Sequence, residues 1–196
     1  MKTSRLEAFS DGVIAILITI MVLELRTPEG HDWAALLSLE HRFFPYALSF
    51  VMLGIYWNNH HHMIHMTDRA TGAILWANLH LLFWLSLVPF GTAWVGETVL
   101  APVPTAVYSA ILMLAGTAYW ILKEAIIRSQ GPHSRLHAAL GSDTKGIASV
   151  AMYVVAFALA FVNTKLSAAI WVAVALIWLI PDRRIEKHML QPPPSA

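Results

Sequence analysis

The sequence predicts an all-helical membrane protein with six transmembrane helices in a single domain. Of its 196 residues, 57% are hydrophobic and only 13% are charged, whereas a soluble domain carries about 25% charged residues. The mean hydropathy is +0.58. Several apolar stretches reach or approach the roughly 20 residues that cross the hydrocarbon core of a bilayer. These three observations favour a polytopic membrane protein over a soluble fold.

Proline, glycine and polar clusters divide the apolar stretches into spans. The first ends before Pro28 and Gly30, and the fourth opens after Pro102, which suits a helix start. The last two are separated only by 163–165, which predicts a tight hairpin. We expect the proline-rich tail, 182–196, to be flexible. The predicted spans are residues 5–25, 36–62, 73–95, 103–126, 147–162 and 166–180.

The basic residues predict the orientation, because loops rich in Lys and Arg stay in the cytoplasm. The other set of ends holds only Arg26 and Lys165, together with Arg42, which is the discordant residue. We therefore expect a protein of the cell membrane with both termini in the cytoplasm. The ends assigned to the cytoplasm hold Lys2, Arg5, Arg69, Lys123, Arg128, Arg135, Lys145, Arg183, Arg184 and Lys187.

Composition excludes several classes of function. The chain has no cysteine, which rules out disulfides, thiolate zinc sites and cysteine nucleophiles. Its formal net charge is +1, so it presents no basic field that would bind nucleic acid.

The first span has two different faces on a helical wheel. Ile16, Ile20 and Leu23 form an apolar stripe with Thr19 at its edge, while Ser10 and Asp11 lie on the far side. The stripe could simply face lipid or other helices, and periodicity alone favours this, because nearly all residues of a spanning helix are apolar. Alternatively, stripes from several subunits meet around an axis and form a constriction that gates by dewetting.

Asp11 requires polar partners at its own membrane depth, because a buried carboxylate without donors is unfavourable. The predicted topology brings the end of the second span and the start of the third to that depth. The second span ends there in the polar segment Trp57 to His65, and the third contributes Asn78, His80 and Trp84. We expect Asp11 to hold the first span against these neighbours.

The segment Arg5-Leu6-Glu7-Ala8-Phe9-Ser10-Asp11-Gly12 resembles the R-x-x-x-F-S-D signature of the transmembrane protein 175 family. This family comprises potassium channels of endosomes and lysosomes and their bacterial relatives. Trp57 to His62 and Pro89-Phe90 are similar to its second and third helices. The resemblance implies a homotetramer in the lipid bilayer whose first spans line a central pore for potassium ions, with no other cofactor and no enzymatic activity.

The resemblance also implies roles for individual residues. The pore stripe becomes Ile16, Thr19, Ile20 and Leu23: the three aliphatic residues form the gate, and Thr19, which has the only side-chain hydroxyl on the stripe, is the candidate for ion selectivity. A structural polar network ties the first span to its neighbours. Its expected members are Arg5, Phe9, Ser10, Asp11, Trp57, Asn59, His60, His61, Asn78 and Trp84.

Two other classes of function are alternatives to a channel. His61 and His65, like His133 and His137, are four residues apart, which can place two imidazoles on one helical face for a metal. Membrane di-iron enzymes use more histidine boxes than these, so we expect no metal site. A small secondary transporter is the second alternative, but the chain shows no internal repeat and no charge near the middle of a span.

Overall fold

The computed structural model describes residues 3–67, 69–131, 134, 136 and 143–179, and helices are the only regular secondary structure in these ranges. The predicted flexible tail, 182–196, lies outside them, as do His133 and His137. The helices are α1 (Thr3–Ile20), the 3₁₀ helix η1 (Met21–Glu24), α2 (Trp33–Leu37), α3 (Glu40–His65), α4 (Gly72–Ser86), α5 (Val88–Glu97), α6 (Pro102–Gln130), α8 (Thr144–Leu159) and α9 (Thr164–Leu179).

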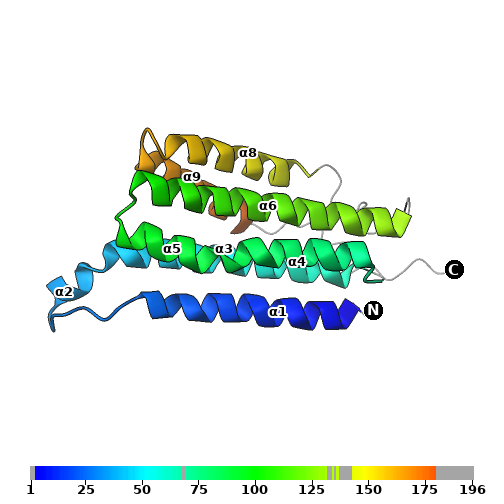
Figure 1. Cartoon of the computed structure of the whole chain (residues 1–196), viewed down its shortest axis with the longest axis horizontal. Coiled ribbons are helices and arrows are strands. Elements are labelled where there is room, and N and C mark those ends of the chain that lie inside the picture. The colour runs from blue at the N-terminus through cyan, green and yellow to red at the C-terminus, as the bar shows by residue number, and fades with distance from the viewer. Residues whose placement is uncertain (1–2, 68, 132–133, 135, 137–142, 180–196) are drawn as a thin grey trace.

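The long helices run side by side along one axis of the molecule (Figure 1). α1 forms one edge of the bundle, where it packs mainly against α3 and α4. α6 packs against α4 and α5 on one side and α8 on the other, and the α8–α9 hairpin forms the edge farthest from α1. This edge position leaves α1 covered by its own chain on one face only.

Length and apolar composition identify the protein as a multi-pass membrane protein. Within the part of the chain that the structure describes, three segments are long and apolar enough to cross a membrane: Thr3–Glu24, Gly72–Glu97 and Pro102–Gln130. α8 and α9 are apolar but have 16 residues each in the described ranges. α3 has 26 residues, but its last turns carry Asn58, Asn59 and consecutive histidines, which lower its hydropathy.

Three of the expected spans are not continuous α-helices. The expected span 36–62 begins in α2 and is interrupted at Ser38 and Leu39 before α3. The predicted span 73–95 is divided at Leu87 into α4 and α5, because Pro89 at the start of α5 has no N–H to continue the hydrogen bonds of α4. The predicted first span, 5–25, is an α-helix only to Ile20 and then tightens into η1.

Arg42, which does not fit the charge pattern, has an acidic partner at its own end of the bundle. Its Nη1 lies 3.4 Å from Glu97 Oε1, and Arg26 Nη2 lies 3.5 Å from the same oxygen. Gly96 permits this close approach of α3 and α5, since a Cβ there would lie 3.2 Å from the Arg42 Cα. The base is therefore paired locally.

Candidate functional site

The two faces of α1 have opposite environments. The residues that pack into the bundle recur every three or four positions, as expected of a helix that is covered on one side. It consists of Leu6, Ser10, Ile14 and Leu17, and Met21 of η1 continues it. On the opposite face, Ile16, Ile20 and Leu23 are 59%, 40% and 76% exposed. The chain thus leaves this aliphatic stripe uncovered.

The 3₁₀ turn continues this stripe beyond the end of the α-helix. In a 3₁₀ helix, side chains three residues apart eclipse one another. Leu23 of η1 therefore lies nearly in line with Ile20, one tight turn further along. The apolar stripe is continuous from Ile16 to Leu23.

Thr19 lies at the edge of the exposed stripe with its hydroxyl hydrogen directed into the helix. Its Oγ1 lies 3.0 Å from the carbonyl oxygens of both Ala15 and Ile16, to which the hydroxyl donates. Such bonds to the preceding turn are common for helical threonine. Because the hydrogen is used within the helix, the lone pairs of the oxygen remain available to a cation on the exposed side.

A buried chain of hydrogen bonds joins three helices near the start of α1. His60 Nε2 of α3 donates to Asn78 Oδ1 of α4 at 2.7 Å. Asn78 Nδ2 donates to Ser10 Oγ of α1 at 2.9 Å, and the Ser10 hydroxyl donates to the Leu6 carbonyl oxygen at 2.9 Å. All three side chains are fully buried. Because Asn78 donates through its nitrogen, its oxygen must accept, which places a proton on His60 Nε2.

A second pair of contacts joins α1 to α3 at the more exposed rim of this region. Trp57 Nε1 donates to Asp11 Oδ1 at 3.1 Å, and His61 Nδ1 lies 2.8 Å from Glu7 Oε1. Sequence analysis did not single out Glu7, although it precedes Asp11 by one helical turn and therefore shares its face. We call the residues of both sets, namely Glu7, Ser10, Asp11, Trp57, His60, His61 and Asn78, the polar network.

Four predicted members lie outside the polar network. Arg5 and Phe9 are exposed, because they precede Ile16 by close to three and two helical turns and so share its face. Asn59 donates to the Ile55 carbonyl of its own helix. Trp84 donates to His80 Nε2, one turn away on α4.

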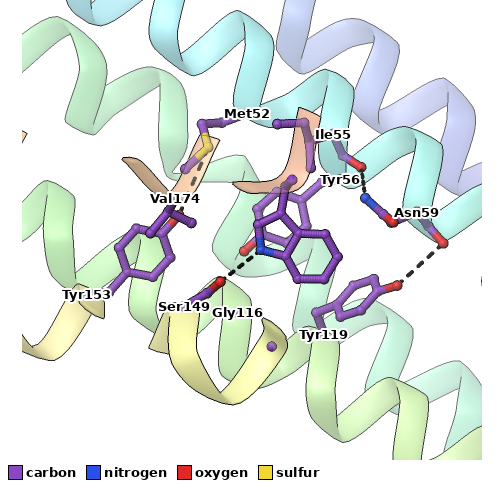
Figure 2. Close-up of a pocket in the computed structure, with 11 residues that line it drawn as sticks. Met52, Ile55, Tyr56, Asn59, Gly116, Tyr119, Ser149, Tyr153 and Val174 are labelled. Carbon is purple, nitrogen blue, oxygen red and sulfur yellow. Dashed lines mark hydrogen bonds between the residues drawn. The ribbon is translucent and has the colours of Figure 1, made fainter. Parts of the chain in front are cut away.

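A cavity of about 50 Å³ lies on the other side of the bundle, between α3, α6, α8 and α9 (Figure 2). Trp178 Nε1 donates to Ser149 Oγ at 2.8 Å across it. The Tyr119 hydroxyl points to the carbonyl oxygen of Asn59 at 3.5 Å. The lining comes mainly from apolar and aromatic side chains, and none of it belongs to α1. The cavity is therefore separate from both the stripe and the polar network.

Comparison with known proteins identifies the family. A family profile described as the endosomal/lysosomal potassium channel TMEM175 matches residues 5–89. A potassium channel of Chryseobacterium sp. (strain P1-3) is 50% identical over 96% of this chain and 98% of its own length. A potassium channel of Streptomyces collinus is 34% identical over 62% of this chain and 63% of its own.

A solved structure extends the similarity to the fold. The crystal structure of a lysosomal potassium-selective channel TMEM175 homolog from Chamaesiphon minutus matches with a TM-score of 0.80 and 29% identity, covering 92% of this chain and 97% of that one. These matches favour neither the histidine-cluster enzyme nor the transporter. The chain therefore belongs to the family of the endosomal/lysosomal potassium channel TMEM175, a family of ion channels and not of enzymes.

Proposed function

We propose that four copies of this chain form a potassium-permeable channel whose pore is lined by the exposed stripe of α1. The observation that supports this most directly is the exposure of Ile16, Ile20 and Leu23 on a helix at the edge of the bundle. Around a four-fold axis, each of these positions contributes a ring of aliphatic side chains. Such rings repel water, so the pore conducts only when they separate.

Thr19 supplies the polar ring within this pore. Its oxygen, with the hydrogen directed into the helix, offers lone pairs where neighbouring positions offer only methyl and methylene groups. Oxygen ligands replace part of the hydration shell of a permeating cation. We assign the discrimination between potassium and sodium to this ring, while Ile16, Ile20 and Leu23 form the gate.

In this proposal the assembly lies in the cell membrane, each chain has six spans, and both termini are in the cytoplasm. The spans are the segment of α1 and η1, α3, the α4–α5 segment, α6, α8 and α9. Clustering of Lys and Arg at one set of ends supports this orientation. Arg42 departs from this pattern, and it forms an ion pair with Glu97 at its own end of the bundle.

Mass and flux together test the proposal. Purified protein in detergent should have a protein mass about four times the 21.8 kDa of the chain, and liposomes that contain it should pass potassium at channel rates. A folded protein that remains monomeric would contradict the shared pore. A tetramer without potassium flux under any voltage or ion gradient would contradict the assigned activity instead.

The selectivity assignment makes a separate prediction. Thr19→Ala should lower the potassium-over-sodium permeability ratio severalfold, because the ring loses its oxygen ligands, while the total current persists. Reversal potentials under bi-ionic conditions measure this ratio. Thr19→Ser is the matched control: it keeps the hydroxyl and should keep the ratio. Equal ratios in wild type and Thr19→Ala would move selectivity to another part of the pore.

A further inference from the structure

Three side chains that can bind metal converge where the first turns of α1 meet the end of α3. Glu7 and Asp11 come from successive turns of α1, and His61 comes from α3. One ligand atom from each lies within 4.8 Å of the others. The side chains are accessible: Glu7 and His61 are 22% and 42% exposed. We propose that Glu7, Asp11 and His61 bind a divalent transition metal of the Zn²⁺ type, which the sequence analysis did not expect.

The donor set fits such an ion. Zn²⁺ binds histidine nitrogen and carboxylate oxygen at about 2.0–2.2 Å, and sites with three protein ligands keep a position for water. At tetrahedral angles, two ligand atoms with these bond lengths lie about 3.4 Å apart, so side-chain rotations that draw the three groups together would close the present cluster around an ion. Two carboxylates offset the charge of the metal, and the imidazole favours a transition metal over Ca²⁺ or Mg²⁺, which prefer oxygen alone.

Neighbouring residues hold two of the three ligands in place. Trp57 Nε1 donates to Asp11 Oδ1, which leaves Oδ2 available and fixes the plane of the carboxylate. The His61 ring stacks on His65, with centroids 6.0 Å apart and planes 20° apart, and lies against Trp57 on the preceding turn. In metal sites, contacts with residues outside the ligand set commonly orient the ligands and restrict their motion.

The metal would replace the Glu7–His61 hydrogen bond by coordination. His61 Nδ1 and Glu7 Oε1, now 2.8 Å apart, would both turn towards the ion, and the imidazole proton would reside on Nε2. One ion then joins α1 to α3 through three side chains. The expected effect is a more stable attachment of α1 to the bundle, which does not depend on channel activity.

Titration of the purified full-length protein with Zn²⁺ tests the site. We expect one ion per chain that raises the thermal unfolding midpoint, and Co²⁺ in its place should give visible absorption bands typical of nitrogen and oxygen ligation. Glu7→Gln and Asp11→Asn keep acceptors for His61 and Trp57 but lose the charge. Each should weaken binding by about tenfold or more, and His61→Gln should do the same.

His31→Gln is the matched control. It removes an exposed histidine from the segment between η1 and α2, which contributes no ligand to the cluster. It should bind Zn²⁺ as the wild type does. The proposal is overturned if the wild type takes up no Zn²⁺, or if Glu7→Gln, Asp11→Asn and His61→Gln all bind it with unchanged affinity. Unfolding in the absence of metal shows whether each variant is folded.

Discussion

Ile16→Asn should raise the potassium conductance severalfold and weaken its gating. At a constriction of aliphatic side chains, the closed state is maintained because water and hydrated ions are excluded from a narrow apolar passage. An amide at position 16 offers hydrogen bonds to water and would remove that barrier in all four subunits of the proposed assembly. Ile16 is more than half exposed and is the first residue of the stripe, so its side chain is free to form such a ring. Currents in planar bilayers at fixed voltage measure the change.

Ile147→Asn provides the matched control for this substitution. Ile147 is also isoleucine and is 65% exposed, but it lies in the first turn of α8, at the edge of the bundle away from α1. Its conductance should stay near that of the wild type. Leu23→Asn should resemble Ile16→Asn, because Leu23 continues the stripe. If neither Ile16→Asn nor Leu23→Asn changes the currents, the pore is not formed by this face of α1.

Asn78→Leu should destabilise the folded chain by about 1–3 kcal/mol. Asn78 is fully buried, and its amide bonds to Ser10 on α1 and to His60 on α3. Leucine has a similar size but leaves both partners without it. In soluble proteins, a buried polar group that loses its hydrogen-bond partner costs about 1–3 kcal/mol. Inside membranes a single hydrogen bond contributes about 0.6 kcal/mol on average, so the loss of two such bonds sets the lower end of the expected range. The free energy of unfolding in detergent measures the loss.

Asn58→Leu tests whether the stability lost in Asn78→Leu is due to the missing hydrogen bonds. Asn58 is half-buried on α3, and its change to leucine alters size and polarity in the same way without touching the Ser10–Asn78–His60 chain. It should change the free energy of unfolding by less than about 0.5 kcal/mol, as most substitutions away from such features do. Equal losses in both variants would show that polarity in general, rather than this network, stabilises the bundle.

The family and the coarse fold could be predicted from the sequence because they depend on strong local signals. Apolar stretches of spanning length predicted an all-helical membrane protein, which the structural match confirms. The eight residues from Arg5 to Gly12 indicated the family, and the profile that begins at Arg5 confirms it. The ends of the helices were harder to predict from the sequence. The 3₁₀ turn after Ile20 and the break at Leu87 depend on packing against neighbouring helices rather than on composition.

Side-chain pairing was predictable only in part. The donors at the end of the second span were identified as partners for α1 because topology brought them to one depth. Which side chain meets which depends on helix rotation. The wheel separates Asp11 from the stripe, but it also places Arg5 on the stripe side, where the structure leaves it exposed. The only signal for Glu7 in the sequence is its spacing of four residues from Asp11, which places both carboxylates on one helical face.

α1 is attached to the bundle in two different ways along its length: by hydrogen bonds and an ion pair near its N-terminus, and by apolar packing beyond them. Its side-chain hydrogen bonds and ion pair to other helices involve Glu7, Ser10 and Asp11. Among the described residues, no side chain from Gly12 to Leu23 bonds to another helix; Ile14, Leu17 and Met21 are held by apolar packing, which has no preferred direction. A small rotation of α1 about its N-terminal end would displace Leu23 more than Ile16, because Leu23 is farther from that end.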